Sequence, residues 1–452
     1  MIKKYSSVFV DKCVITIVMC MLAVLDIACL YNCLWMHVLL VFAIMASGML
    51  LCFLKNGIEM NYGLILVAMG FLYVTGPIIA LIVGQLSKDD VWKDLWLVYF
   101  SAFSCFFFSL GYSFCIERKK TKSVEKHLPD KNKYNHVMLK FILLIGTGIF
   151  FLTKIFILSK IGIYSYLTLG RAATKKIIVS NFGWAPLIDS VSYVLMVFAL
   201  EMHYEKKRET KDLFYLCIFI ILFSLNVGMA ILEVDRSSFL IAVLPIIYLL
   251  YYHKVINNRT LIIGGVTLLL LFFAWKTIVP SLFSGSISSV TKLNLSWPYE
   301  LYGWIHIGGT LATDIGEGGL VYKGGYTYWK ALESIVNPVF QQYESLSTWY
   351  VRTYYPEIYN AGGGFAFSSI LEAYLNFGLL GAPIVFVPFG IIIRTIEGKR
   401  DSIFWRCLYA LLIAFIYKIF RSEMYSIVKL SFWTWAVPLF SLWIVARKTK
   451  MR

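Results

Sequence analysis

The chain has 452 residues, of which 59% are hydrophobic and only 15% charged, and its mean hydropathy is +0.72. Soluble domains are on average about 45–50% apolar and about 25% charged. A chain this apolar cannot cover one water-soluble core with polar residues. This composition excludes a soluble enzyme, a disordered chain and, despite a net charge of +16, a nucleic-acid-binding protein.

The nine cysteines lie inside apolar runs, and none belongs to a CxxC pair or to a spacing typical of metal ligands. They are expected to be small buried apolar residues. The sequence also contains no Walker A loop, no HExxH or GxSxG motif and no DxD-type pair near a membrane face. An ATP-driven pump and a membrane metalloprotease are therefore disfavoured, and an enzyme of this sequence is expected to use neither a metal nor a cofactor.

Twelve apolar stretches dominate the chain. A membrane-spanning helix needs about 20 predominantly apolar residues. The stretches are residues 13–33, 34–54, 62–86, 92–116, 137–158, 182–203, 213–232, 237–252, 261–279, 367–393, 404–420 and 425–446. They predict an all-α polytopic membrane protein with about twelve transmembrane helices, of which 237–252 and 404–420 are short and are expected to be tilted or broken.

Basic residues near the span ends predict the orientation, because cytoplasmic loops carry an excess of Lys and Arg. With the N-terminus inside, the inner segments and the start of the fifth span hold 26 of the 42 basic residues. Both termini are then cytoplasmic. The basic connector 117–136 is expected to contact anionic membrane lipid. The first apolar run has no small-residue cleavage site and is not expected to be a signal peptide.

One loop, at residues 280–366, is long and divides the chain into helices 1–9 (1–279), the loop itself and helices 10–12 (367–452). It is rich in Gly, Ser, Tyr and Trp and poor in charge. In the predicted orientation it lies outside, where aromatic faces and hydroxyl groups suit a sugar-handling surface. Its aromatic content predicts a folded loop with short interfacial helices rather than a floppy connector.

Four arginines on the predicted outer side oppose the charge bias, and a planar guanidinium suits a phosphate that it can hold with two hydrogen bonds. They are Arg171, Arg236, Arg352 and Arg421. Together they indicate an anionic lipid-phosphate ligand at the outer surface. Each can instead pair locally: Arg236 with Asp235 or Glu233, and Arg421 with Glu423. Arg171 can instead contact lipid headgroups.

Glu372 and Asn376 are four residues apart near the start of the tenth span, so they are expected on one face of a helix. A carboxylate at that depth is expected to face the protein interior, where Glu372 can orient an arginine or act as a base. His306 lies in a Gly-rich part of the long loop. It is either a structural hydrogen-bonding residue or a base.

Four segments resemble the Wzy-type oligosaccharide repeat-unit polymerases. These are Asp235-Arg236-Ser-Ser, similar to the family's short outer turn; the stretch from Gly363 to Gly381, which closes the large loop and opens the next span; Phe420-Arg421-Ser-Glu423, similar to an Arg–acid pair near the end of a late span; and Arg171 in the third outer loop. Arg352 followed by Gly363 resembles a spacing in the large loops of some members. For Arg171 that spacing is one residue off.

The resemblance implies a GT-C-like fold with one large periplasmic loop and a metal-independent glycosyltransferase in the bacterial inner membrane. Its reaction is the polymerisation of undecaprenyl-diphosphate-linked repeat units into O-antigen, capsule or a related surface polysaccharide. Arg236 and Arg421 are expected to hold the donor diphosphate, with Glu372 orienting the set. Arg171 and Arg352 are expected to guide the lipids. Glu423, Asn376 and His306 are further candidates for substrate contact.

The partners implied are the lipid-linked oligosaccharide, membrane lipids and a chain-length regulator protein, with no nucleic acid. Two other functions stay open. An O-antigen ligase also carries a histidine in a large late loop, and His306 precedes Gly316-Glu-Gly-Gly319, a loose similarity. A lipid-linked oligosaccharide flippase also has about twelve spans, but it usually lacks so large an outer loop and shows repeat symmetry.

Overall fold

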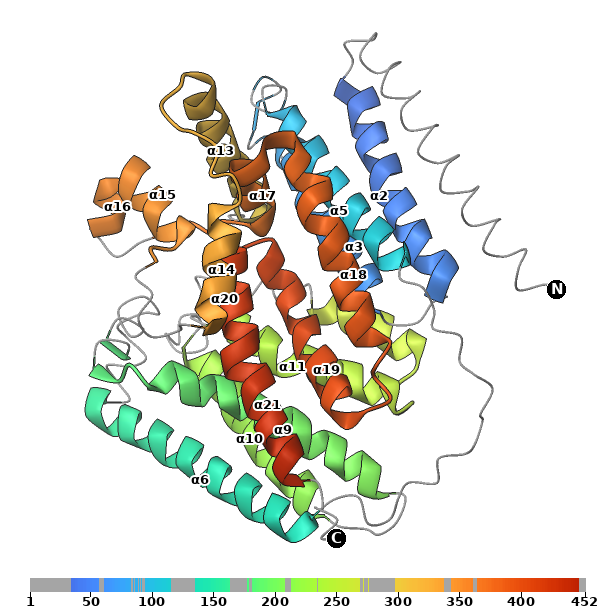
Figure 1. The fold of residues 1–452 in the computed structure, drawn as a ribbon, viewed down its shortest axis with the longest axis vertical. Coiled ribbons are helices and arrows are strands. Elements are labelled where there is room, and N and C mark those ends of the chain that lie inside the picture. The colour runs from blue at the N-terminus through green and yellow to red at the C-terminus, as the bar shows by residue number, and fades with distance from the viewer. Residues whose placement is uncertain are drawn as a thin grey trace, which may run out of the picture.

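The computed structural model describes residues 34–56, 61–82, 94–114, 135–162, 181–207, 213–233, 235–268, 297–336, 343–360 and 364–446, with a few single positions between them. These parts fold into helices joined by short turns (Figure 1). Several expectations lie outside the described residues: the span 13–33, most of the connector 117–136, Arg171 and Gly363. The span expected at 261–279 is described only in part.

The first half of the described chain contains long apolar helices close to the expected spans. They are α2 (Leu34–Asn56), α3 (Tyr62–Ile82), α5 (Leu95–Phe114), α6 (His136–Ile161), α9 (Ala185–Lys207), α10 (Phe214–Leu232) and α11 (Arg236–Tyr252). Helix α6 turns side chains such as Phe141, Leu144 and Leu152 outward. An outward apolar face is expected of a helix that meets lipid.

The last part of the chain contains broken helices. The tenth expected span consists of α17 (Ser369–Phe377), a 3₁₀ turn (Gly378–Leu380) and α18 (Gly381–Glu397). Gly378 has a φ of +60°, which residues with a side chain rarely adopt, so the helix breaks there. Helix α19 (Ile403–Ile419) follows, and then α20 (Met424–Lys429), a π-helical stretch (Leu430–Ala436) and α21 (Val437–Ala446).

Within the described residues, eight helical segments are long and apolar enough to cross a membrane, and α11 is a shorter apolar helix. The all-helical class is therefore confirmed, while the number of twelve stays a prediction. Helix α5 packs closely against α18 in the core. A Cβ added to Gly390 would lie 2.3 Å from the backbone oxygen of Phe108, so only glycine permits this approach of the two helices.

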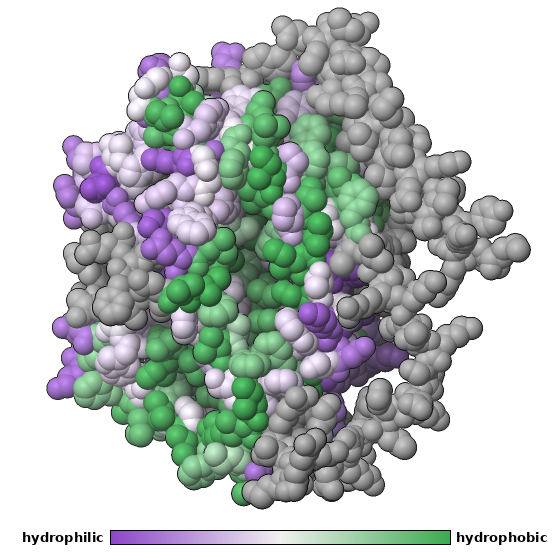
Figure 2. Space-filling view, viewed as in Figure 1, coloured by the Kyte–Doolittle hydropathy of each residue, from purple (hydrophilic) through white to green (hydrophobic). Residues whose placement is uncertain are grey.

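The described part of the long loop is folded, as expected. It contains α13 (Trp297–Gly316), α14 (Tyr326–Val336), α15 (Leu346–Tyr354) and α16 (Pro356–Asn360). Helices α13, α15 and α16 gather with α17 at one end of the molecule (Figure 1). Figure 2 shows hydrophilic side chains over this end and hydrophobic ones over the middle of the same face. The fold thus has a polar end and an apolar body.

His306 lies in helix α13, in keeping with the helices expected in the loop, and the glycines that follow it are helical too. One local expectation was wrong. Cys217 on α10 is exposed, whereas Cys52, Cys105 and Cys407 are buried as expected. The reason is that α10 buries only one face, and Cys217 lies on the other.

Candidate active site

Glu372 lies at the centre of a buried polar network. Ser368 caps the N-terminus of α17, its hydroxyl accepting a hydrogen bond from the Leu371 N–H at 3.2 Å, and this places Glu372 in the first turn. The Glu372 side chain is fully buried. Its Oε1 accepts a 2.6 Å hydrogen bond from the hydroxyl of Thr327, and its Oε2 accepts one of 2.5 Å from the N–H of Met424.

Asn376 completes this network one helical turn later. Its Nδ2 donates to the Thr327 hydroxyl and to the Glu372 carbonyl, both at 2.8 Å, and its Oδ1 accepts from the Gly325 N–H at 3.1 Å. Both side chains thus reach Thr327, as positions four apart on one helix allow. The network ties the start of α14, helix α17 and the start of α20 together.

Glu423 is a second buried carboxylate. It directly precedes Met424, whose N–H donates to Glu372. Its Oε2 accepts a 2.5 Å hydrogen bond from the Leu346 N–H, and its Oε1 accepts one of 3.1 Å from the Ser426 hydroxyl. Burial raises the pKa of Glu423 to about 7, against the hydrogen bonds that lower it. A carboxyl group with that pKa can exchange a proton near neutral pH.

Glu372 can be the partner of an arginine or a base, and its described hydrogen bonds come from a hydroxyl and a backbone N–H, which are uncharged donors. The alternative that Arg421 pairs locally with Glu423 is not supported by the described contacts of Glu423, which are to Leu346 and Ser426. A buried carboxylate needs hydrogen bonds, and backbone N–H groups at the start of a helix supply them without a cation.

The described arginines differ in their surroundings. Arg421 lies in the turn between α19 and α20, half-buried, with its guanidinium 5.6 Å from the ring centre of Tyr417. Arg352 forms an ion pair of 2.7 Å with Glu344, and its side chain is 54% exposed. An exposed pair of this kind contributes about 0–1 kcal/mol. Arg352 therefore has a local partner, which was one of the two alternatives.

The Asp235–Arg236 segment forms the sharp start of α11. Asp235 caps this helix: its Oδ1 accepts hydrogen bonds from the Ser237 N–H at 2.9 Å and the Ser237 hydroxyl at 2.7 Å. Both serines of the segment thus donate hydrogen bonds to the carboxylate of Asp235. Arg236 is the first helical residue and only 5% exposed. The turn holds this arginine in one place at the protein interior.

A polar cavity of about 280 Å³ lies beside this turn. Lys154 of α6 reaches into its lining and forms ion pairs with Asp189 at 2.7 Å and with Glu233 at 3.8 Å. Asp235 lines the cavity from one side, and Lys418, three residues before Arg421, lines it from another. The cavity therefore connects the Asp235–Arg236 turn with the end of α19.

An apolar groove of about 620 Å³ begins at the buried network. Gly325, Phe377 and Met424 line the end of the groove nearest the network. The N–H groups of Gly325 and Met424 donate hydrogen bonds to Asn376 and Glu372, and Phe377 follows Asn376 in the chain. From there the groove follows α18 along Ile384, Pro388 and Ile392, with residues of α14, α19 and α20 on its other sides. The polar network thus lies at one end of this apolar groove, which we call its head.

The remaining candidate, His306, has no described contact with Glu372, Asn376, Arg421 or Glu423. It is exposed on α13, with its ring against Tyr302 at 5.9 Å between centroids. Two contributors were missed by sequence reasoning. Thr327 is an ordinary threonine in a helix, and nothing in its neighbourhood signals a buried carboxylate 45 residues away. The second is Lys154, a charge within an expected span, whose pairing with Asp189 the sequence does not reveal.

These features define a multi-pass helical membrane protein with a buried polar site at the head of an apolar groove. The model of the family described as O-antigen polysaccharide polymerase Wzy matches residues 325–452. This match confirms the resemblance to Wzy-type polymerases, and it covers α14 through α21, with Glu372, Asn376, Arg421 and Glu423. Comparison with curated proteins and with solved structures gives no match.

Proposed function

We propose that the protein polymerises undecaprenyl-diphosphate-linked oligosaccharide repeat units at the periplasmic face of the bacterial inner membrane. The bond between the anomeric carbon of the growing glycan and its lipid diphosphate breaks. A hydroxyl at the non-reducing end of a new lipid-linked unit forms the new bond to that carbon. The electron pair leaves with the lipid diphosphate, and the hydroxyl proton goes to a base.

One observation carries this proposal: the family match and the buried network at the head of the apolar groove occupy the same part of the chain. A lipid-linked sugar has a polar head and a long apolar tail, so it needs a polar site continuous with an apolar one. The groove, with a cavity volume of about 620 Å³, can take a stretch of a polyprenyl tail. The head group then lies beside the turn that contains Arg421 and Glu423.

The arginines would act on the charge that develops during the reaction. As the lipid diphosphate leaves, negative charge grows on the oxygen that was bonded to the sugar, and fixed cations beside it lower the barrier. Arg236 and Arg421 are assigned this role, since Arg236 begins α11 and Arg421 follows the end of α19, and both are close in the chain to Asp235 and Lys418, which line the cavity. Arg171 and Arg352 are assigned to guiding the donor or acceptor lipid.

The carboxylates have separate proposed roles. Glu372 is a positioning residue, because all its described contacts are structural: it holds the first N–H of α20 and thereby the turn with Arg421 and Glu423. Glu423 is our candidate for the base, since its pKa near 7 allows it to accept a proton at neutral pH. Asn376 supports Glu372 through Thr327, and His306 and the aromatic residues of the loop are assigned to sugar contact.

The deciding experiment uses the purified protein with lipid-linked repeat units in detergent. Polymer of increasing length supports the proposal. Translocation of the lipid-linked unit in vesicles without elongation would instead support a flippase. Transfer of finished glycan to lipid A–core without elongation would support a ligase. Either of those outcomes overturns the polymerase assignment.

A further inference from the structure

A separate cavity of about 470 Å³ lies where α11 ends and α18 meets α19, away from the polar network. Three tyrosines, two asparagines, one isoleucine and two cations, Lys254 and Arg400, line it. No acidic side chain belongs to this lining. The chemistry of the walls, with cations, amides and phenols together, suits a phosphate group.

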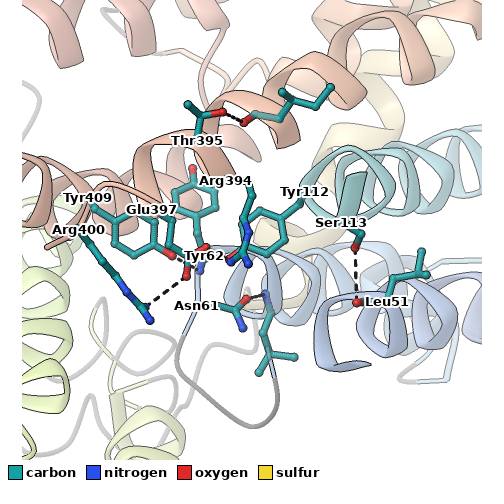
Figure 3. A network of polar contacts seen from close by, with 12 residues as sticks. Leu51, Asn61, Tyr62, Tyr112, Ser113, Arg394, Thr395, Glu397, Arg400 and Tyr409 are labelled. Atoms are coloured by element: carbon teal, nitrogen blue, oxygen red, sulfur yellow. Dashed lines mark hydrogen bonds and ion pairs between the residues drawn. The ribbon is translucent and has the colours of Figure 1, made fainter. Parts of the chain in front are cut away.

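Two carboxylates near the cavity, Glu397 and Glu201, each bind a cation that lies outside the lining. Glu397 is held by Arg394 at 2.8 Å and by the hydroxyl of Tyr112, while Arg400 lies farther from it at 3.5 Å (Figure 3). On the other side, Glu201 pairs with Arg406 at 2.5 Å. The surroundings therefore leave the cavity with a positive character.

The backbone of Lys254 supports a specific role for this cavity. Lys254 has a φ of +59°, and it is the one non-glycine residue with a positive φ in the described part of the chain. It ends helix α11 at a position where glycine or asparagine is usual. Strained backbone of this kind gathers at functional sites. Here the strained turn brings a lysine to the wall of the cavity.

Tyr248 supplies an independent observation. It lines the cavity and is only 1% exposed. Its hydroxyl lies within reach of the Arg400 guanidinium, which can only donate, and no acceptor for the hydroxyl proton is found among the described residues. A buried hydroxyl whose proton has no acceptor is costly. An oxygen atom of a ligand in the cavity would provide that acceptor.

We propose that this cavity binds the phosphate of an anionic phospholipid headgroup. Lys254 and Arg400 would hold the charge, and Tyr248 would donate its hydroxyl proton to a phosphate oxygen. A lipid is favoured over a soluble phosphate because the helical segment beginning at Asn258 leaves Ile262, Ile263 and Val266 largely exposed. This apolar face lies next in the chain to the cavity, where acyl chains would run.

Binding would also connect elements that the fold already holds close. Arg406 donates to the hydroxyl of Tyr252 at 3.1 Å and to the carbonyl of Arg400 at 3.3 Å. A phosphate between Lys254 and Arg400 would be a second link between the end of α11 and the turn before α19, beside the link that Arg406 makes. The bound lipid is therefore expected to raise the melting temperature of the protein.

The test measures binding of phosphatidylglycerol to the full-length protein in detergent by native mass spectrometry and by thermal shift. Phosphatidylcholine and inorganic phosphate are the comparison ligands. The variants are Lys254→Gly, which removes the charge and keeps the turn conformation, and Arg400→Gln. Arg259→Gln is the matched control, since Arg259 is an exposed cation nearby that does not line the cavity.

Each cavity variant is expected to weaken phosphatidylglycerol binding about fivefold, as one cation at a lipid surface contributes about that factor. Lys254→Gly should melt no lower than the wild type without lipid. Wild-type binding by both variants, or an equal loss in Arg259→Gln, would overturn the proposal. A thermal shift with inorganic phosphate equal to that with phosphatidylglycerol would overturn the assignment to a lipid.

Discussion

The hydroxyl of Thr327 donates a 2.6 Å hydrogen bond to the buried carboxylate of Glu372, although the two residues lie on different helices and 45 positions apart. The same hydroxyl accepts a hydrogen bond from Asn376. Thr327 therefore satisfies two buried groups at once. Within the residues that the polymerase family model matches, one hydroxyl thus holds together two buried polar side chains.

We expect Thr327→Val to destabilise the protein, because the substitution keeps the shape but leaves a buried Glu372 oxygen without its donor. A loss of this kind costs about 1–3 kcal/mol. Thermal melting of the purified protein in detergent measures it. Thr327→Ser keeps the hydroxyl and should melt close to the wild type. Equal melting temperatures for the valine variant and the wild type would show that the bond is unimportant.

Arg236→Ala and Arg421→Ala are expected to abolish long polymer. The proposed reason is the loss of a fixed cation beside the leaving diphosphate, and one such group is worth about 10²–10³ in rate. Polymer ladders from cells that depend on the variant measure the effect, with protein level measured by immunoblot. Lys160→Ala, at the exposed end of α6, is the control. Normal ladders from both arginine variants would overturn their assignment.

Glu423 predicts a pH dependence. Its pKa of about 7 in the folded protein lies above the ordinary 4.5, so the folded state binds the proton more tightly than the unfolded state. Stability from this group is then complete below about pH 4.5 and is lost as the pH rises through about 7. The melting temperature measured from pH 5 to 8 should fall less in Glu423→Gln than in the wild type.

If Glu423 is the base, activity has the opposite trend, because a base works in its deprotonated form. Polymerisation by the wild type should rise as the pH increases through about 7. Glu423→Gln should lose activity over the whole range while it stays folded. An active glutamine variant with an unchanged pH profile would exclude Glu423 as the base.

The ion pair of the buried Lys154 with the partly exposed Asp189 predicts non-additive effects. Lys154→Met removes the cation that Asp189 and Glu233 share, and the cost is expected to be smaller than the about 3–5 kcal/mol of a fully buried pair. Adding Asp189→Leu removes one of these two carboxylates. The double variant should therefore melt higher than Lys154→Met alone. A double variant that melts lower than either single variant would contradict this account.

The apolar groove predicts a substrate effect. Leu332 lines the groove and is largely exposed, so Leu332→Trp is expected to fill the groove without disturbing the core. A tail that binds there would be excluded, which raises KM for the lipid-linked unit. Ile391→Trp is the control. Ile391 lies on α18, which supplies several lining residues, but its own side chain does not line the groove. Equal KM values for the two variants would argue against the groove as the tail site.

Much of the helical architecture could be predicted because hydropathy is a local property. Helix α10 ends at Leu232 and α11 ends at Tyr252, both at the residues expected from the apolar runs. The tenth span was different: its hydropathy is continuous, yet it breaks at Gly378. A glycine in an apolar run is common within a helix and at a turn, and only packing, here against the ring of Tyr322, decides between the two.

At the candidate site, too, the sequence predicted local geometry but not tertiary contacts. Spacing alone placed Glu372 and Asn376 on one face, since four residues complete about one helical turn. It gave no means to choose between an arginine and a threonine as the partner of Glu372. Charge suggested a pair of Arg421 and Glu423, but the structure directs Glu423 to a backbone N–H from α15.

The sequence by itself determined that the chain is a membrane protein, roughly where its helices run and which family it resembles. These properties depend on sums over neighbouring residues, and neighbours are given by the sequence. The tertiary structure decided which distant groups meet: Thr327 with Glu372, Lys154 with Asp189, and Lys254 with Arg400 around one cavity. Such meetings depend on distances of a few ångströms between helices, which only the packing of the whole chain sets.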